Sequence, residues 1–493
     1  MSMITRRRLI NGLVAATAVG AGGNLLHGCG DRRTSHNQNR GRIGRTNYPN
    51  ILVLLIDDLR PQLNCYGRRE MVSPNIDRLA AEGTLFERAY CQVPICGASR
   101  ASTLAGARAT STRFGSDYQA RKDEDMPNEP SLPLWFKDKG YRTISYGKIY
   151  HVIEDDADSW LEEPWRPRGM WGLESYVTPE NRAIVEAHGG TYGPPFEMAN
   201  VADNIYTDGQ IADRTVRTLE RLQDGHAPFF LATGLFRPHL PFNSPTPYWD
   251  LYQRENLSLA DNPFRPAGAP DAALHNWGEL RNYYGIPAEG PVSDEMALNL
   301  IHGYYAATSY ADALVGQILD ALDRLELADN TIVILWGDHG WQLGEHGLWC
   351  KHANFETSLH APMIVRGPGI PAGQRTDALV EFVDIYPSLC DLSGLEKPDH
   401  LEGSSFVPLL ENPNLPWKEA VFSYYNGGHS VKSDRYRYTE WTNDDGFVWA
   451  RMLYDHVDDP GETVNIAERP EAEAIVAQHQ QMLEQGWSAY QIS

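Results

Sequence analysis

Two pairs of polar residues each follow a long apolar run in this 493-residue sequence. Asp57-Asp58 ends the first run, and Asp338-His339 ends the second. Continuous apolar runs are typical of buried parallel strands, and ligands of parallel sheets gather at the carboxyl ends of the strands. Three carboxylates with one imidazole favour a hard cation such as Ca²⁺ or Mg²⁺. Either pair alone could be a solvated turn, but the two together predict one metal site.

A third segment carries a cysteine and an arginine one helical turn apart. Cys96 and Arg100 lie in the stretch Pro-Ile-Cys-Gly-Ala-Ser-Arg-Ala-Ser at residues 94–102. A spacing of four places two side chains on one face of a helix. By itself, the pattern fits a buried cysteine beside a helix N-terminus. The acidic pairs elsewhere in the chain favour a reactive site instead.

The charge balance restricts the partners of the protein. The chain has 43 Lys and Arg against 65 Asp and Glu, a net charge of −22, and 42% of its residues are apolar. The first 45 residues hold eight arginines and one aspartate, so the rest carries −29 against their +7. This composition allows a large core and excludes a general nucleic-acid binder, whose surface would be basic. An anionic substrate would need a local cationic pocket.

The basic N-terminus belongs to a targeting pattern. Arg6-Arg7-Arg8 precedes a weakly apolar stretch at 12–26, which predicts an export signal of the twin-arginine type over residues 1–28. Cys29 resembles the cleavage site of a lipoprotein signal, with an ordinary cleaved signal peptide as the alternative. Residues 29–47 are polar and arginine-rich, as expected for a tether. We expect an exported protein, periplasmic or anchored at the cell surface through lipid on Cys29.

The cysteines do not predict a structural zinc site. The six lie at positions 29, 65, 91, 96, 350 and 390, and no pair has the spacing of a zinc ribbon. Whether the four other than Cys29 and Cys96 form disulfides is left open by their spacing.

Alternating strand and helix patterns predict an α/β sandwich with a large, mostly parallel central sheet. Residues 154–200 and 237–292, rich in Pro, Gly, Trp and Tyr, are expected to be loops that shape a binding site. Together these features predict a catalytic domain over residues 48–414. The expected strands are 50–56, 141–146, 229–232 and 331–336, and the expected helices are 73–79 (capped by Ser73), 132–139, 205–222 and 296–327.

The pattern changes after about residue 415. Three short strand-like pieces precede a helical stretch, which predicts a small α+β subdomain over residues 415–493 with a short antiparallel sheet. The strand-like pieces are 420–425, 435–441 and 449–454, and the helical stretch is 470–485.

With these residues in view, the sequence resembles the type I sulfatases of the alkaline-phosphatase superfamily. In that family, a Cys or Ser within the motif C/S-x-P/A-x-R is oxidised to formylglycine. Residues 96–100 match the motif, with Ala98 where proline is commoner. The similarity covers most of residues 48–465 and is closest to iduronate-2-sulfatase and its bacterial relatives, which also carry histidine at the place of His339. It rests on Gly147-Lys148-Ile149-Tyr150-His151, residues 237–242, residues 338–347, Lys351 and residues 453–462.

The resemblance implies a sulfuric ester hydrolase with a metal centre. The metal ligands would be Asp57, Asp58, Asp338, His339 and the formylglycine that a formylglycine-generating enzyme forms from Cys96. The cofactor would be one Ca²⁺ ion rather than Mg²⁺. The cation would neutralise sulfate oxygens and favour the deprotonated form of the nucleophilic hydroxyl.

The resemblance also implies catalytic roles for five further residues. Arg100 would hold the formylglycine hydroxyl, and Lys148 and Lys351 would bind sulfate oxygens. His239, with Lys351, would protonate the leaving alcohol, and His151 would take the proton from the second formylglycine hydroxyl, which expels sulfate. Outside this framework, Lys148 could be a surface lysine, Lys351 a helix cap and His239 a residue that rigidifies a loop.

Four other side chains remain outside the predicted site. Trp341 could stack on a sugar or belong to the core, and His352 is equally open. His346 and His360 are interpreted as structural.

The aromatic loops and the export signal favour a sulfated oligo- or polysaccharide as substrate, because aromatic faces stack on sugar rings. The leading hypothesis is a glycan O-sulfatase that acts on 2-O-sulfated uronic acid or on an algal polysaccharide. One alternative is a phosphoester or phosphonate hydrolase of the same superfamily. The other is a degenerate glycan-binding lipoprotein in which Cys96 stays unmodified.

Overall fold

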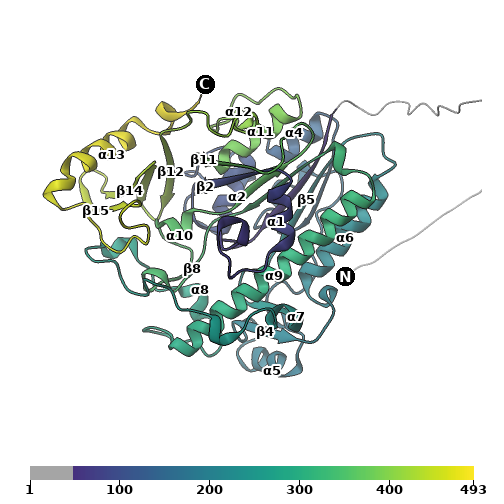
Figure 1. The fold of residues 1–493 in the computed structure, drawn as a ribbon, viewed down its shortest axis with the longest axis horizontal. Helices are drawn as coiled ribbons and strands as arrows, with labels where there is room; N and C mark the ends of the chain where they lie inside the picture. Colours follow the sequence, from purple (N-terminus) through teal and green to yellow (C-terminus); the bar gives the residue numbers. More distant parts are fainter. Residues whose placement is uncertain (1–47, 493) are drawn as a thin grey trace, which may run out of the picture. The chain divides into compact units, whose positions relative to one another are not determined.

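A seven-stranded sheet forms the centre of the computed structural model, which describes residues 48–492 (Figure 1). Six strands run in one direction, and only β10 is antiparallel to both of its neighbours. The predicted mostly parallel sheet is therefore confirmed. In spatial order the strands are β11 (Gln374–Glu381), β2 (Thr84–Tyr90), β10 (Met363–Arg366), β7 (Thr331–Gly337), β1 (Asn50–Ile56), β5 (Phe229–Leu235) and β3 (Arg142–Gly147).

Helices cover both faces of this sheet. Alternate residues of β1 point to opposite faces, so Ile51 and Val53 belong to one apolar cluster while Leu52 and Leu54 belong to the other. This explains why the sequence of β1 is apolar throughout. The first cluster packs against α2 (Cys96–Ala105), α4 (Leu132–Asp138) and α11 (Ile385–Leu392), and the second packs against α1 (Pro74–Ala81), α6 (Thr207–Leu222) and α9 (Asp294–Arg324).

One predicted detail of α1 is wrong. The helix begins at Pro74, but the Ser73 hydroxyl accepts no hydrogen bond from the first turn. Instead, the N–H groups of Asn75 and Ile76 donate to the Asp312 carboxylate on α9. The free N–H groups of the helix are therefore satisfied by a tertiary contact, which the local pattern does not reveal.

A second, antiparallel sheet follows in sequence, with α13 (Glu473–Gln485) packed on it. Its strands are β12 (Ala420–Tyr425), β13 (Gly428–Ser433), β14 (Tyr436–Thr442) and β15 (Val448–Asp455). The sequence pattern missed β13, because Gly-His-Ser-Val-Lys-Ser contains a single strongly apolar residue. The described residues, 48–492, all belong to one compact unit, so the boundary between residues 414 and 415 stays a prediction.

The two aperiodic segments carry short elements of their own. A two-stranded parallel pair, β4 and β6, lies within them, and the 3-10 turn at 203–205 delays the start of α6 to Thr207. The other elements are α3 (Lys122–Asp125), α5 (Pro179–Ala187), β4 (Phe196–Ala199), β6 (Phe242–Pro245), α7 (Thr246–Trp249), α8 (Gly278–Arg281), β8 (Gln342–Leu343), β9 (Trp349–Cys350), α10 (Glu356–Leu359) and α12 (Val407–Glu411).

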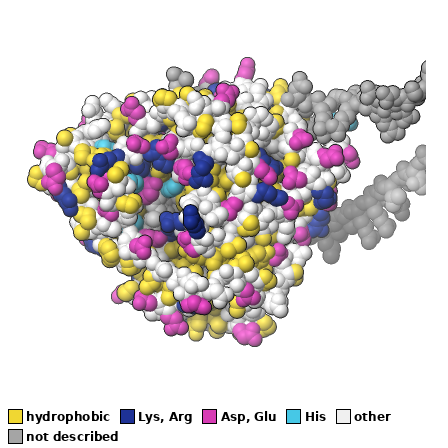
Figure 2. Space-filling model, viewed as in Figure 1, with side chains coloured by type: hydrophobic (Ala, Val, Ile, Leu, Met, Phe, Trp, Pro, Cys, Tyr) yellow, Lys and Arg dark blue, Asp and Glu magenta, His cyan; other side chains and the backbone are white. Residues whose placement is uncertain are grey.

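The cysteines from Cys65 onward are free thiols, and four of the five are buried. Within residues 48–492, no helix has the length and apolarity to cross a membrane. The predicted export signal, the tether and Cys29 lie outside the described residues. On the face drawn in Figure 2, acidic and basic side chains are interspersed, with no continuous basic field.

Candidate active site

The two acidic pairs meet at the carboxyl ends of neighbouring strands. Ile56 of β1 lies opposite Gly337 of β7, so the residues that follow them are adjacent. The Asp58 N–H donates to Asp338 Oδ1 at 2.9 Å, and Asp58 has a positive φ of 57° that turns the chain at this point. The parallel register therefore places all four residues of the two pairs in one buried centre.

The donor set fits a hard divalent cation. One carboxylate oxygen from each of Asp57, Asp58 and Asp338 lies within 4.8 Å of the others. His339 Nδ1 donates to the Gly340 carbonyl at 2.9 Å, which leaves the lone pair of Nε2 facing Asp58 Oδ1 at 3.5 Å. Burial raises the pKa of Asp58 to about 8, although His239 and Lys351 oppose the shift. A bound cation would keep this carboxylate ionised.

Cys96 is the first residue of α2 and points into the same centre. Its Sγ lies 3.3 Å from His339 Nε2 and 3.7 Å from Asp58 Oδ1. Burial and the negative charge of Asp57 raise the pKa of the thiol to about 12. Since only the thiolate is an effective nucleophile, unmodified Cys96 is poorly suited to attack, whereas an oxygen at this position would be a suitable metal ligand.

Arg100 links the carboxylates of the two strands. Its Nε donates to Asp338 Oδ2 at 2.9 Å, and Nη2 donates to Asp57 Oδ1 at 2.9 Å. Nη1 donates to the backbone carbonyls of Lys148 and Ile149. The guanidinium is buried, so these charge-assisted bonds fix the ligand carboxylates and the β3 end together. Its expected contact with a formylglycine hydroxyl stays a prediction.

Lys148 follows β3 and reaches the centre because of two glycines. Its Nζ donates to Asp57 Oδ2 at 2.5 Å. Gly147 has a φ of 72°, and a Cβ on it would lie 1.9 Å from the Gly234 carbonyl oxygen of β5. Only glycine allows the strands to approach so closely and the chain to turn. Lys148 is therefore a buried residue of the site rather than a surface lysine.

Lys351 enters the site from the turn after β9. Its Nζ donates to Asp58 Oδ1 at 3.1 Å. The residues on either side, Cys350 and His352, have positive φ values of 73° and 49°. Strained conformations of this kind persist where the surrounding structure holds them, typically at functional sites. The turn directs Lys351 inward, so the lysine caps no helix.

His239 and His151 flank the same pocket. His239 Nδ1 donates to the Leu240 carbonyl at 2.6 Å, which directs Nε2 toward the pocket, 3.7 Å from Asp58 Oδ2. Burial and the charge of Lys148 lower the pKa of His151 to about 2, so its ring is neutral. Within residues 48–492, Nδ1 of His151 has no hydrogen-bond partner, although it is buried. The ring is therefore in the form that can accept a proton, with one nitrogen unpaired.

Three residues of the pocket were missed by the sequence analysis. The Glu279 carboxylate contacts Lys351 Nζ at 2.7 Å and His239 Nε2 at 3.0 Å, and Tyr118 donates to it at 3.2 Å. Trp171 is 38% exposed, and Lys148 Nζ lies 5.6 Å from the centre of its ring. Glu279 and Trp171 lie in the aperiodic segments, whose patterns predict a binding site but no single residue.

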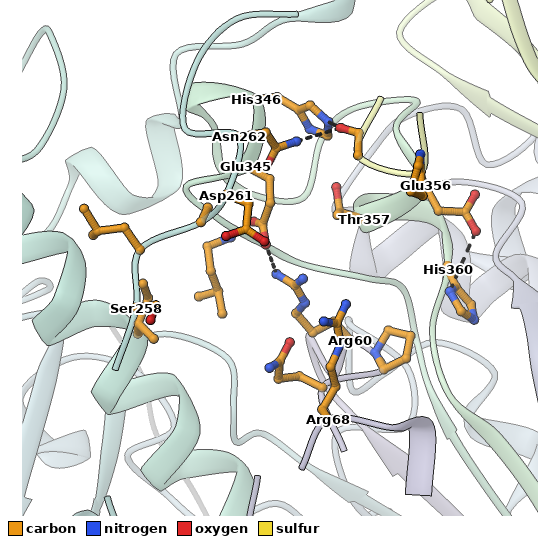
Figure 3. A pocket seen from close by; sticks show the side chains of 18 of the residues that line it. Arg60, Arg68, Ser258, Asp261, Asn262, Glu345, His346, Glu356, Thr357 and His360 are labelled. Carbon is orange, nitrogen blue, oxygen red and sulfur yellow. Dashed lines mark hydrogen bonds and ion pairs between the residues drawn. The ribbon is translucent and has the colours of Figure 1, made fainter. Parts of the chain in front are cut away.

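Trp341 belongs to the core, since it is only 1% exposed and packs against Phe242 and Tyr304. His346 bonds Gln342 Oε1 and the Gly461 carbonyl, both at 3.0 Å, in a structural role. With His360, it lines a separate cavity of about 890 Å³ whose lining includes the Arg60–Glu345 ion pair and none of the predicted site residues (Figure 3).

The fold is an α/β sandwich with a mostly parallel sheet. Its buried acidic centre, with a cysteine at a helix start and several cations nearby, is suited to metal-assisted hydrolysis of an ester. The chain itself belongs to the sulfatase family: a family model described as "Sulfatase" matches residues 49–395, and one described as "N-sulphoglucosamine sulphohydrolase, C-terminal" matches residues 344–488. It is thus a sulfuric ester hydrolase.

Individual relatives agree with this assignment. The chain is 34% identical to an iduronate 2-sulfatase of Mus musculus over 80% of its length and 85% of the relative. It is 33% identical to a sulfatase of Formosa agariphila, with 85% and 83% of the two chains covered. Among solved structures, one in complex with D-glucosamine-2-N,6-O-disulfate has a TM-score of 0.71 at 22% identity, over 90% of this chain and 98% of that chain, and therefore has the same fold.

Proposed function

We propose that the protein hydrolyses O-sulfate esters of a glycan, using formylglycine at position 96 and one Ca²⁺ ion. The observation that carries the proposal is the convergence of Cys96 with three carboxylates and with Arg100, Lys148 and Lys351 in one buried pocket. A sulfate monoester is anionic, so its reaction needs cations around its oxygens. The acidic body makes such a local concentration of cations necessary.

Each residue has a role that its geometry suits. A bound cation would neutralise charge on the sulfate oxygens, held by Asp57, Asp58, Asp338, His339 and residue 96. Lys148 and Lys351 bind sulfate oxygens. His239 donates a proton to the leaving sugar oxygen, and neutral His151 accepts the proton that residue 96 must lose for sulfate to depart.

The pocket and the relatives support a glycan as the substrate. Trp171 presents a half-exposed ring beside Lys148 and His151, suited to stack on a sugar. The names of an iduronate 2-sulfatase and of a glucosamine-disulfate complex among the relatives support a sulfated glycan, with 2-O-sulfated uronic acid as the first candidate and algal polysaccharide sulfate as the second. Because the body is acidic, a polyanion would be engaged end-on, at a terminal sulfated residue.

Two measurements test the proposal. Mass spectrometry of a peptide spanning residues 94–100 should show a loss of about 18 Da, the change from thiol to aldehyde. Sulfate release should then be detected from defined sulfated oligosaccharides, faster from terminal than from internal residues. If the aldehyde is present and no glycan loses sulfate, the glycan assignment is wrong. An unmodified Cys96 would favour a glycan-binding protein, and cleavage of phosphonate esters alone would favour the phosphohydrolase alternative.

We further propose that the protein is exported and is anchored through lipid on Cys29. The supporting observation is the basic and apolar leader that ends at this cysteine. Labelled palmitate should enter the wild type and not a Cys29→Ala variant, which should be found in the soluble fraction. Equal membrane association of both proteins would contradict lipid anchoring.

A further inference from the structure

Glu279 is the acidic residue of the pocket for which the proposed chemistry has no use. It lies in α8, two residues after Trp277, which has a φ of 48° and whose ring packs against the Arg281 guanidinium at 3.6 Å. The side chain is 15% exposed, so its carboxylate faces the pocket rather than bulk solvent. A carboxylate at this place repels an anionic ester and so weakens its binding. We therefore expect Glu279 to make a contribution that offsets this cost.

The contacts of Glu279 join the two groups assigned to the leaving oxygen. Oε1 lies 3.0 Å from His239 Nε2 and 3.0 Å from Lys351 Nζ, and Oε2 lies 2.7 Å from Lys351 Nζ. Lys351 is thereby shared between Asp58 of the metal centre and Glu279 outside it. One carboxylate therefore fixes the distance between the proton donor and the cation that acts with it.

The segment around Glu279 also holds the backbone of Lys351. His275 accepts a hydrogen bond from the Trp277 N–H at 3.0 Å through Nδ1, so its Nε2 donates to the Lys351 carbonyl at 3.1 Å. Residues 275–279 thus contact Lys351 at both its carbonyl and its ammonium group. His239 is held in the same way from two sides, by the Leu240 carbonyl at Nδ1 and by Glu279 at Nε2.

We infer that Glu279 is a positioning residue for departure of the sugar: it holds His239 Nε2 and Lys351 Nζ side by side, so that both can reach the oxygen that leaves when the S–O bond breaks. The electron pair of that bond goes to the sugar oxygen, which takes the proton from His239. The inference rests on the proposed function. In this role Glu279 touches neither the sulfur nor the metal. It only sets the positions of the two donors, His239 and Lys351.

Leaving-group dependence separates this role from a structural one. A proton at the leaving oxygen matters little for a good leaving group and greatly for a poor one. The test compares wild type, Glu279→Gln and Glu279→Asp on a series of aryl sulfates. The series runs from 4-nitrophenyl sulfate, which has a good leaving group, to phenyl sulfate. The phenol that leaves from phenyl sulfate has a pKa of about 10, like the tyrosine side chain. Glu279→Gln keeps the shape of the side chain and loses its charge, whereas Glu279→Asp keeps the charge.

The expected result is a loss that grows along the series. For Glu279→Gln, kcat should fall by about threefold or less on 4-nitrophenyl sulfate and by about 30-fold or more on phenyl sulfate, below the full value of a general acid. Glu279→Asp should recover part of the loss on phenyl sulfate. The matched control is Glu289→Gln, an exposed change of the same charge in the same segment, which should leave the series unchanged.

Formylglycine content by mass spectrometry and Tm show that each variant is matured and folded. A uniform loss across the series, or no loss at all, would overturn the role of Glu279 while sulfate release by the wild type upholds the proposed function. A matured wild type that cleaves no sulfate ester would overturn both.

Discussion

Arg100 shows how one side chain can control a centre built from separate strands. Its planar guanidinium reaches Asp57 after β1, Asp338 after β7 and the carbonyl groups after β3 at the same time. Lysine has one ammonium group and cannot match this set of directions.

Arg100→Lys should therefore lose both activity and stability. We expect kcat/KM on 4-nitrophenyl sulfate to fall by about 100-fold or more, because small displacements of reacting groups have effects of that size. Unfolding free energy should fall by about 3 kcal/mol, since a buried carboxylate loses its partner. The control is Arg113→Lys at the part-exposed pair with Glu402, where about 1 kcal/mol or less is expected. A fully active Arg100→Lys variant would show that the guanidinium bridge between Asp57 and Asp338 is dispensable.

At the scale of elements, the site depends on where strands end and how closely they pack. Lys148 is placed by the end of β3 against β5, and the contact is possible because Gly147 has no side chain. Gly147, which is far from the metal ligands in sequence, thus sets the position of the Lys148 ammonium group through the backbone.

Gly147→Ala should separate β3 from β5 and displace Lys148. We expect a loss of about 3 kcal/mol in unfolding free energy and at least a tenfold loss of kcat. Gly140→Ala is a matched control, because Gly140 also has a positive φ, of 90°, but has no atom within 4 Å of the added Cβ. It should lose only the conformational contribution, about 1 kcal/mol, and keep its activity. If both variants lose the same unfolding free energy, the loss comes from the positive φ that they share and not from a clash with β5.

A buried ion-pair network joins the end of β11 to the second sheet. Glu381 accepts from both Nη atoms of Arg108 at 2.5 Å, from Lys418 at 2.8 Å and from the Phe422 N–H at 2.9 Å. Burial alone would raise the pKa of Glu381, but Arg108 and Lys418 outweigh it and lower the value to about 2.

This network should make stability depend on pH with a defined sign. The folded pKa lies below the unfolded value, so Glu381 stabilises the protein at pH values above about 4.5 and loses that contribution as the pH falls toward 2. Glu381→Gln should lower the unfolding free energy by about 3 kcal/mol at pH 7, and its difference from wild type should shrink between pH 4.5 and 2 in urea titrations. The exposed Glu396→Gln change should have little effect. A difference that is constant with pH would exclude this linkage.

At the scale of the whole molecule, metal binding and folding should be thermodynamically linked. The ligands come from the ends of β1 and β7 and from the start of α2, which lie far apart in sequence and together only in the folded chain. A cation bound there would therefore stabilise the native state by mass action.

Calcium should raise Tm and chelation should lower it. At a free ion concentration of 100 times Kd, the free energy of unfolding should rise by about 2.7 kcal/mol. Calorimetry in the presence of Ca²⁺ and of EDTA would detect this change. Asp58→Asn removes a ligand charge without changing the shape of the side chain, so its Tm should respond weakly to the ion. Mg²⁺ in the same titration tests the choice of ion. Identical responses of wild type and Asp58→Asn would place the calcium effect outside this centre.

The class of fold and the family are evident from the amino-acid sequence alone. Buried parallel strands must be apolar along their whole length, so residues 50–56 and 331–336 are recognisable locally, as are the acidic pairs that follow them. The motif at residues 96–100 and the order of the other segments were sufficient for the resemblance to sulfatases, which the family comparison confirmed.

The residues that complete the pocket are evident only in the folded chain. Glu279 and Trp171 come from segments with no periodicity, and Tyr118 lies outside every predicted element. Their meeting with His239, Lys148 and Lys351 depends on long-range packing. The same reason explains the replacement of the Ser73 cap by Asp312 and the burial of Trp341, which the local pattern left open. Periodicity records which side of an element faces the core, whereas side-chain partners across loops are set by the folded chain as a whole.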